Sequence, residues 1–533
     1  MPIRPTFYGF EMARTALSAS QKNIDITGQN IANINTPGYS RQRVNLSSVG
    51  PGGINWRFAL HPAEMVGLGV NVDSIRRVRD QFLDMRFRRE FSENSRLAVK
   101  LDVLGYVESN IDEFIGESGT LHSIVVDFQN AFQNLHLNAD DVEFMTMTRS
   151  AAEKLVYTSR TIAGRIQEIT EHTYEQLDII KKDINRIAQA LGDVNKEIRN
   201  QFLLGGVSNE LLDERDLLLD QLSAYGDVTV RPAIIEFDGK EVDSGGLHVY
   251  FGKFDADAYD PDDPLGADSI LVSGAIPIDV DDDGKPVYHY TLDFNFTLED
   301  IADNTDNQVR LEWADGRGDF ITTSGEIFGY YEMLNGKGDI SQTGDNVDIA
   351  SKGIPYFMEM INAFVQELAS VFNDINYLPL FTASDGGDMT ALNITIVDEW
   401  QKDPTYILRS IDDGSPGAAR NDNILRMIDA LKAERTFIDA NGNEYTGNFL
   451  QYLGSINSEM GLEVSYNAKR KDVSDINLLS VDMYRASIMD VDSDEEAMNL
   501  MKFQKSYNAA ARFMTTLDEM LDVIVNRLGI VGR

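Results

Sequence analysis

The residues best suited to bind a metal form a short acidic run before Gly284. Its aspartates stand at alternate positions: Asp279, Asp281 and Asp283. This order opens a calcium loop of the D-x-D-x-D-G type, whose carboxylate oxygens coordinate the ion. Such a loop needs a bidentate glutamate at its twelfth position, and Tyr290 stands there instead. We therefore predict an acidic β-turn and no metal site, and a calcium titration tests the alternative.

Other patterns with catalytic potential are weak. The 6 histidines are scattered without metal-ligand spacing, and no serine lies in a nucleophile elbow. The tripeptide Arg317-Gly318-Asp319, often linked to adhesion, most simply forms a turn. No glycine-rich loop that would hold a phosphate is present. The sequence predicts neither an enzyme nor a cofactor site.

Composition narrows the class of protein further. The chain has 533 residues, of which 43% are hydrophobic, so it can form several folded domains. Its 86 acidic and 47 basic residues give a net charge of −39, which disfavours binding to nucleic acid. With 0 cysteines, disulfides and thiolate metal sites are excluded. The sequence shows no membrane span and no cleavable signal, so we expect a cytosolic protein or one exported by another route.

The C-terminal segment, residues 497–531, predicts a coiled-coil helix. Two apolar seams repeat every seven residues without a break. The first consists of Leu500, Tyr507, Met514, Leu521 and Leu528, and the second of Phe503, Ala510, Leu517, Ile524 and Val531. An acidic run from Ser493 suggests a capping box at the start of this helix.

The N-terminal segment, residues 8–34, predicts a second amphipathic helix. Its apolar stripe is Phe10, Leu17, Ile24 and Ile31, and we expect Ser20 and Thr27 to weaken it. Pro37 and Gly38 end the helix, because proline restricts the preceding residue and Pro-Gly suits a type II turn. Residues 41–46 alternate like a short strand.

Between these ends, apolar stripes at 180–198 and 354–375 predict long helices in a bundle. Short apolar runs separated by Asp, Gly and Pro predict antiparallel strands. The fold class expected is therefore multidomain and mainly α, with a terminal coiled coil, a long helical bundle and an inserted antiparallel β domain. The expected domains are 1–50 plus 490–533 (terminal coiled coil), 51–227 plus 341–489 (bundle with mixed α/β elements) and 228–340 (outer β domain).

The segment from Asn30 to Gln42, NIANINTPGYSRQ, resembles the N-terminal signature of the bacterial flagellar rod, hook and hook-associated axial proteins. Two further segments resemble this family: Asp213-Glu214-Arg215-Asp216, and Asp494-Glu495-Glu496-Ala497 with Leu500, Phe503, Gln504 and Tyr507. The resemblance covers about 1–50, 150–225 and 340–533 but not the insert.

The resemblance implies a structural component of the flagellum, a ring of identical subunits that joins hook to filament and transmits torque. The implied partners are further copies of the chain, the hook protein, the next hook-associated protein and an export chaperone bound to the C-terminal helix. Nucleic acid and membrane are not among them. The implied location is extracellular, after flagellar type III export.

The resemblance also implies roles for particular residues. Pro37 and Gly38 set the turn, and Tyr39 and Arg41 anchor the next segment to a neighbouring layer. The full set of expected assembly residues is Leu17, Ile24, Ile31, Asn33, Asn35, Pro37, Gly38, Tyr39, Arg41, Leu500, Phe503, Tyr507, Met514, Leu517, Leu521, Ile524 and Leu528.

Three alternatives remain at this point. A hook or rod protein shares the N-terminal signature but usually lacks the long bundle. A surface-displayed enzyme or adhesin requires a functional cluster within 228–340. A cytosolic coiled-coil scaffold predicts absence from isolated flagella.

Overall fold

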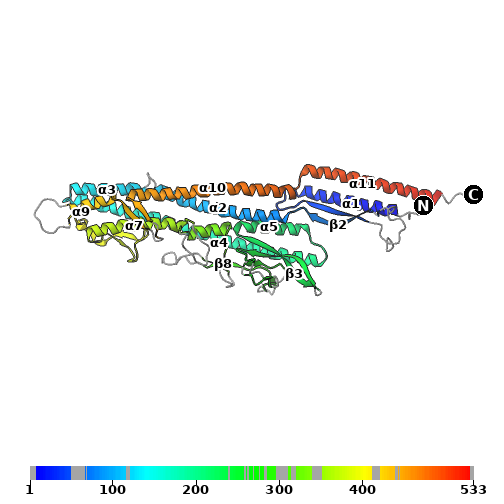
Figure 1. The fold of residues 1–533 in the computed structure, drawn as a ribbon, viewed down its shortest axis with the longest axis horizontal. Helices are drawn as coiled ribbons and strands as arrows, with labels where there is room; N and C mark the ends of the chain where they lie inside the picture. The colour runs from blue at the N-terminus through cyan, green and yellow to red at the C-terminus, as the bar shows by residue number, and fades with distance from the viewer. Residues whose placement is uncertain are drawn as a thin grey trace, which may run out of the picture.

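The computed structural model is an elongated molecule whose helices run along its long axis (Figure 1). It describes residues 8–527 except 50–66, 68, 116–119, 238–239, 257–259, 261–262, 268, 275–276, 281–284, 296–309, 314–319, 339–350, 411–420, 439–441 and 443. The predicted Arg317-Gly318-Asp319 turn and most of the acidic run before Gly284 lie outside the described residues. No helix in the described part is long and apolar enough to cross a membrane.

Helices dominate the described chain. They are α1 (Tyr8–Ala32), α2 (Gln81–Ile115), α3 (Thr120–Leu137), α4 (Val142–Leu203), α5 (Asn209–Tyr225), α6 (Gly325–Asn335), α7 (Ile354–Asn376), α8 (Asp398–Lys402), α9 (Asp422–Lys432), α10 (Phe449–Met489) and α11 (Ser493–Asp522). A 3-10 turn, η4 (Pro404–Tyr406), and a π-helical turn, η5 (Val523–Arg527), complete the set.

The strands form small antiparallel sheets, which pair as β1–β2, β3–β4–β5, β6–β7, β8–β9, β10–β11 and β12–β13. Their bounds are β1 (Gln42–Val49), β2 (Gly69–Arg77), β3 (Val228–Phe237), β4 (Lys240–Phe251), β5 (Ile270–Val272), β6 (Asp279–Val280), β7 (Pro286–Val287), β8 (Leu292–Asn295), β9 (Arg310–Trp313), β10 (Phe381–Ala383), β11 (Ile394–Ile396), β12 (Arg435–Ile438) and β13 (Glu444–Gly447). Long helices with small antiparallel sheets confirm the predicted fold class.

Helix α4 runs through both hydrophobic cores of the molecule. Its 62 residues span roughly 90 Å at 1.5 Å per residue. Its first part, including Leu155 and Ile166, lies in one hydrophobic core with α3, α7 and the start of α10. Its second part, including Ile184 and Leu191, lies in another core with α5 and the sheets of the insert. The two cores therefore follow one another along the rod, and one helix links them.

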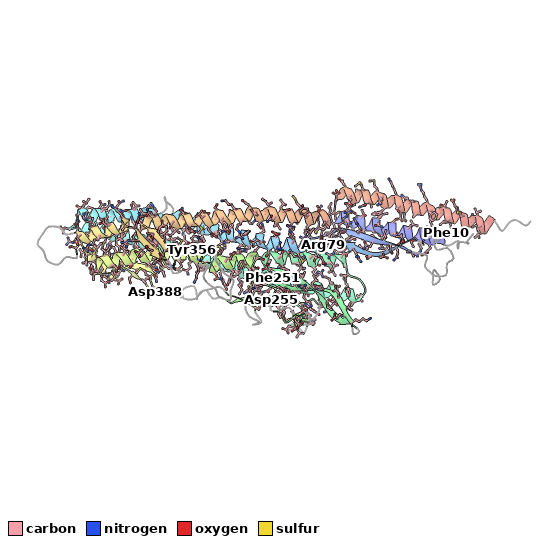
Figure 2. The ribbon with its side chains drawn as sticks, viewed as in Figure 1. Phe10, Arg79, Phe251, Asp255, Tyr356 and Asp388 are labelled. Carbon is pink, nitrogen blue, oxygen red and sulfur yellow. The ribbon has the colours of Figure 1, made fainter. Side chains whose placement is uncertain are left out.

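The predicted domain ranges can be compared with these elements. The ribbon β1–β2 packs on α1, so the boundary expected at residue 50 falls between its two strands. Within the range expected to be β, Gly325–Asn335 is the helix α6, which packs against α2. Figure 2 places Phe10 near one end of the rod, Arg79 where α1 and α11 meet the bundle, and Asp388 toward the other end.

Helix α11 differs in two details from the sequence prediction. Its N-cap is Asp492, whose side chain accepts from the Glu495 backbone at 2.8 Å, so the capping box expected from Ser493 is wrong. The α-helix stops at Asp522 rather than at Val531, and a π-helical turn follows.

Candidate assembly interface at the chain ends

The two ends of the chain lie side by side. Helices α1 and α11 contact each other along their length, although 460 residues separate them in sequence (Figure 1). The hydroxyl of Ser20 donates to that of Ser506 at 3.2 Å. An added Cβ on Gly9 would lie 3.0 Å from the side chain of Leu517, so the helices approach closely there. This contact between the chain ends agrees with the terminal coiled coil of the predicted fold class.

The contact face of α1 is made of short and polar side chains. Ala13, Ala19, Ser20, Asn23 and Thr27 are all less than 10% exposed. Ser20 and Thr27, which interrupt the predicted apolar stripe, lie in this buried face, where short side chains allow two helices to approach. The predicted stripe residues flank this face and are half-buried: Leu17, Ile24 and Ile31.

The predicted seam residues of α11 fall into three groups. Six are half-buried: Leu500, Phe503, Ala510, Met514, Leu517 and Leu521. Tyr507 and Ile524 are 37% and 46% exposed, so they are less covered than the other described seam residues. The physical reason is that a single neighbouring helix covers only one side of α11. Leu528 and Val531 lie outside the described residues.

The turn after α1 has the predicted form. Gly38 has a φ of +76°, and the backbone of Tyr39 donates to the Thr36 carbonyl at 3.2 Å. A Cβ on Gly38 would lie 3.1 Å from that of Leu217, so the turn packs closely on α5. Pro37 is exposed, as expected of a residue at the tip.

Of the two asparagines expected here, neither is buried. Asn35 is exposed, and the half-buried Asn33 donates to the Gln29 carbonyl one helical turn earlier at 3.0 Å. These contacts are local, so they do not join α1 to another part of the chain.

Asn30, which the sequence analysis did not single out, is the polar centre of this end. It is 1% exposed and accepts from the Gln42 backbone at 3.0 Å and from the Tyr39 hydroxyl at 2.9 Å. Its amide donates to the Gln42 carbonyl at 3.0 Å and to Glu496 at 3.3 Å. Burial and the nearby Asp213 carboxylate raise the pKa of Tyr39, which keeps its hydroxyl protonated as a donor.

Arg41 joins the turn to the start of α11 through ion pairs with Glu495 and Glu496, which we call the Arg41 clamp. Its Nε donates to Glu496 at 2.8 Å, and its Nη1 donates to Glu495 at 2.9 Å. The backbone of Arg41 also donates to the Met489 carbonyl, the last residue of α10, at 2.8 Å. The hydrogen bond from Arg41 holds the pKa of Glu495 below its usual value. One residue thus connects the N-terminal turn with both C-terminal helices.

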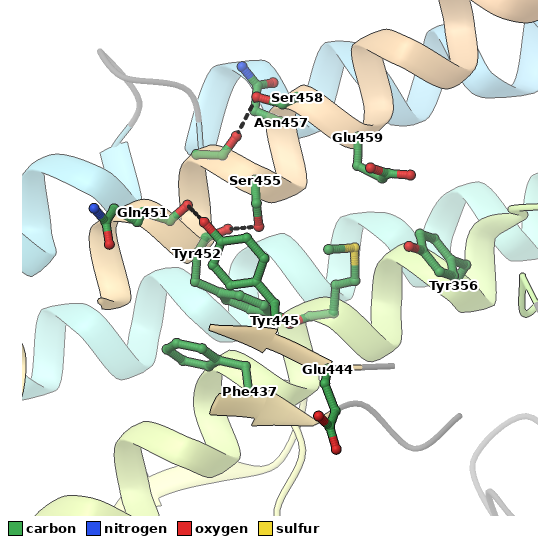
Figure 3. Close-up of a pocket in the computed structure, with 12 residues that line it drawn as sticks. Tyr356, Phe437, Glu444, Tyr445, Gln451, Tyr452, Ser455, Asn457, Ser458 and Glu459 are labelled. Atoms are coloured by element: carbon green, nitrogen blue, oxygen red, sulfur yellow. Dashed lines mark hydrogen bonds between the residues drawn. The ribbon is translucent and has the colours of Figure 1, made fainter. Parts of the chain in front are cut away.

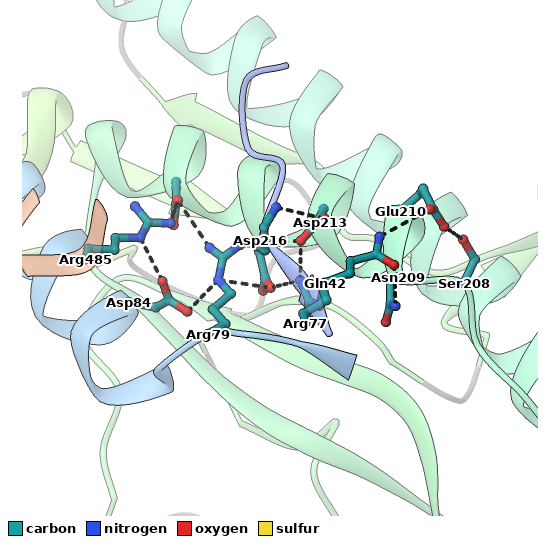
Figure 4. A network of polar contacts seen from close by, with 12 residues as sticks. Gln42, Arg77, Arg79, Asp84, Ser208, Asn209, Glu210, Asp213, Asp216 and Arg485 are labelled. Atoms are coloured by element: carbon teal, nitrogen blue, oxygen red, sulfur yellow. Dashed lines mark hydrogen bonds and ion pairs between the residues drawn. The ribbon is translucent and has the colours of Figure 1, made fainter. Parts of the chain in front are cut away.

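A buried ionic network lies next to this clamp, where β2, α2, α5 and α10 meet (Figure 4). The Asp-x-Arg-Asp segment on α5 supplies much of it. Arg77 contacts both Asp213 and Asp216 at 2.8 Å, and Asp213 also accepts from the Ser40 backbone at 3.1 Å. The network therefore reaches the segment that follows the turn.

The second half of the network holds the helices together. Asp84 on α2 contacts Arg79 at 2.7 Å and Arg485 at 2.8 Å, and Arg485 also pairs with Asp220 on α5. Arg88 contacts Asp220 at 2.7 Å. All these side chains are at most 13% exposed, so each charge depends on its partners.

Burial and the neighbouring charges shift the pKa values of Asp216 and Arg215. Burial would raise the pKa of Asp216, but Arg79, Arg215, Arg77 and Arg88 together hold it below its usual value. Burial lowers the pKa of Arg215 to about 10, against the attraction of Asp216. Arg215 donates to the Gly245 carbonyl at 3.0 Å and so ties α5 to the insert.

A separate cleft of about 700 Å³ lies at the start of α10 (Figure 3). Its aromatic residues largely pack on one another, since the Phe437 and Tyr452 rings stack at 4.1 Å. Gln451 and Glu444 lie at its edge. Within the described part of the chain, no group of three or more His, Cys, Asp or Glu residues could hold a metal ion.

Comparisons with known proteins agree with this arrangement. Three family models match: "Flagellar hook-associated protein FlgK helical domain" at 109–256, "Flagella basal body rod protein" at 10–39 and "Flagellar basal body rod FlgEFG protein C-terminal" at 487–528. The last two fall on α1 with its turn and on α11.

The similarity to two known proteins extends over nearly the whole chain. The chain is 27% identical to "Flagellar hook-associated protein 1" of Bacillus subtilis, with 99% of each chain covered. It is 22% identical to the protein of that name from Salmonella typhimurium, with 96% of this chain and 98% of the relative covered. "The structure of the flagellar hook junction protein FlgK from Burkholderia pseudomallei" superposes with a TM-score of 0.37 and 14% identity, over 57% of this chain and 46% of that one.

Paired chain ends carrying rod-protein signatures define a subunit of the flagellar axial structure. Within that class, the chain is similar over nearly its whole length to proteins named flagellar hook-associated protein 1, and residues 109–256 match the helical domain of that protein.

Proposed function

We propose that this protein is a structural subunit of the bacterial flagellum at the junction of hook and filament. Copies of the chain form a ring that joins the two tubes and transmits torque. The observation that carries the proposal is the module formed by α1 and α11, which the Arg41 clamp closes. The similarity to proteins named flagellar hook-associated protein 1 supports the same role. The role is mechanical, and no catalysis is assigned to the chain.

The long shape suits a load-bearing subunit. The buried ionic network fixes α2, α5 and α10 next to the terminal module, so a force applied to that module passes directly into the bundle. In this proposal, residues 1–50 and 490–533, together with β2, form the assembly module. The bundle surrounds that module in the ring, and the β insert faces outward.

The proposed partners are the neighbours that a subunit of such a ring would have. Copies of the chain contact each other round the ring, the hook protein lies on one side, and the next hook-associated protein lies on the other. Exposed apolar residues of α11, including Tyr507, Phe513 and Ile524, offer a surface to these neighbours and to an export chaperone before assembly. The proposed location is extracellular, on the flagellum, after export without a cleaved signal.

A deletion of the gene tests this function. We expect complete hooks without filaments in electron micrographs, and flagellin shed into the medium. Missing hooks would move the assignment to a hook or rod protein. Normal filaments would overturn the structural role altogether.

A further inference from the structure

The outward side of α10 is unusually apolar. Eight large side chains between residues 462 and 488 are 37–67% exposed: Leu462, Tyr466, Val473, Ile476, Leu479, Met483, Tyr484 and Ile488. Several follow a seven-residue spacing, since Tyr466 precedes Val473 and Ile476 precedes Met483 by 7 positions each. We call this set the α10 outer face. It extends along roughly 40 Å of helix, parallel to the long axis of the rod (Figure 1).

The inward side of the same stretch is partly polar. Helix α10 packs on α2, and its buried residues there include Asn467, Ser474 and Arg485, each at most 8% exposed. Asn94 of α2 donates to Ser474 at 3.3 Å. A surface helix ordinarily turns its apolar stripe to the core and its polar residues to water. Here the outward side carries more large apolar residues than the inward side, so the packing of the isolated chain does not account for them.

The charge of this stretch also differs from that of the rest of the chain. Residues 462–488 carry 4 basic and 4 acidic residues, hence a net charge of 0, whereas the whole chain carries −39. The basic residues are Lys469, Arg470, Lys471 and Arg485, and the acidic ones are Glu463, Asp472, Asp475 and Asp482. Two copies of an acidic protein repel one another over most of their surfaces. Arg485 is buried in the ionic network, so the other charges of this stretch are 3 basic and 4 acidic residues, close to balance, and repulsion between copies is weaker there.

We propose that the α10 outer face binds a second copy of this chain, side by side along the rod. This rests on the proposed ring and names the surface through which neighbouring subunits meet. Eight large, about half-exposed side chains present on the order of 700 Å² of surface. That exceeds the largest apolar patch of a typical monomer and approaches the roughly 800 Å² that each partner gives to a standard interface.

The neighbouring elements support a second copy as the occupant. The next helix, α11, also carries exposed apolar residues, since Met498 and Met501 are 59% and 55% exposed, and α11 belongs to the assembly module proposed above. A lateral contact along α10 would extend that module's contacts into the bundle. The exposed Lys469 would lie against the acidic surface of the neighbour.

Photo-cross-linking in assembled flagella tests the proposal. The amino acid p-benzoylphenylalanine replaces Val473, which is 58% exposed at the centre of the face. Irradiation of isolated hook–filament preparations should give a product that mass spectrometry identifies as two copies of this chain. The same substitution at Leu425, 44% exposed on α9 near the far end of the rod, is the matched control and should give little of it.

A variant links the product to the apolar contact. Ile476→Asp with Leu479→Asp places charges in the face, and because both residues are exposed the chain should still fold. We expect the two-copy product to fall by about ten-fold or more, since an interface that buries unpaired charges is strongly weakened. Leu425→Asp should leave the yield unchanged. Circular dichroism of each variant confirms folding.

Two results would overturn the proposal. One is a cross-link from position 473 to a different flagellar protein, or no cross-link, while the chain is present in the preparation. The other is an equally strong two-copy product from position 425. Failure of the proposed function has a different outcome, because the chain would then be absent from isolated flagella.

Discussion

Replacing Asp216 by asparagine should loosen the joint between the terminal module and the bundle. The substitution keeps the side-chain shape, so it creates no cavity. It removes one negative charge that lies 2.8 Å from Arg77 and 3.6 Å from both Arg79 and Arg88, and Asp216 is only 11% exposed. Each such pair is worth about 4 kcal/mol at an effective dielectric constant of about 20, before desolvation is subtracted. Removal of one partner of a buried ion pair typically costs about 3–5 kcal/mol.

Hydrogen exchange measured by mass spectrometry reports this cost locally. A loss of about 3 kcal/mol in the free energy of local opening speeds amide exchange roughly 100-fold. We expect this acceleration in α5 and β2, which carry the network, and not in α9 near the far end of the rod. The matched control is Glu11→Gln, which breaks the exposed pair of Glu11 and Arg14 and should leave exchange nearly unchanged, because solvent screens this pair.

The pH dependence gives a second check on the same variant. The folded-state pKa of Asp216 lies below its unfolded value, so its stabilising effect is complete above about pH 4–5 and is lost only as pH falls through the folded pKa. The difference between wild type and Asp216→Asn should therefore be constant from pH 6 to about pH 8. Exchange in α5 that is unchanged by Asp216→Asn, or changed no more than by Glu11→Gln, would refute the reasoning.

Three further substitutions test other parts of the structure. Gly38→Ala should destabilise the turn by about 1–2 kcal/mol, because Gly38 has positive φ and an added Cβ would contact Leu217. Gly28→Ala, at an open helical position, is the control and should not destabilise it. The rate of amide exchange in residues 30–42 distinguishes the two variants. Burial, reinforced by a nearby aspartate, raises the pKa of Glu326 to about 7, so folding favours its protonated form and wild type should lose stability as pH rises from 5 to 8. Glu326→Gln should remove that loss, and equal changes in melting temperature for both proteins would contradict it. Leu521→Asp should prevent incorporation into flagella while exchange in the bundle stays normal, and normal incorporation would count against the terminal seam.

Local patterns in the sequence predicted the elements well. Heptad spacing predicted α11, and stripes of three and four predicted α4 and α7. Helical periodicity arises from residues within one or two turns, so it can be read without knowledge of the fold. The Pro37-Gly38 turn was predictable for the same reason, since both residues act on their own backbone dihedrals.

The sequence did not predict which side of each terminal helix is buried. The apolar stripe of α1 flanks the contact, while Ser20, Thr27 and Asn30 are buried in it. In α11, the seam residue Tyr507 is 37% exposed. The buried side depends on how many neighbours a helix has, and that number is a property of the tertiary structure and of the assembly.

The ionic network was also only partly predictable. The segment containing Asp213 and Asp216 stood out by resemblance, but its partners Arg77 and Arg79 lie more than 130 residues away in sequence. Isolated arginines on a strand and a loop carry no periodic signal. A useful signal would have been the charged residues on α5 that stand among leucines. Asp213, Arg215 and Asp216 lie between two runs of leucine, where a buried helix face would be expected.

The central claim is that the two ends of one chain pair with each other in the flagellum, and a disulfide tests it most directly. The native chain has 0 cysteines, so Ser20→Cys with Ser506→Cys introduces a single candidate bond where the hydroxyls lie 3.2 Å apart. Under mild oxidation of isolated flagella, we predict an intramolecular disulfide, which non-reducing electrophoresis shows as a shift of the monomer band without a dimer band. Ser18→Cys with Ser506→Cys, with Ser18 exposed on α1, should not form it. Disulfide-linked dimers, or no bond in the Ser20 variant, would contradict the account.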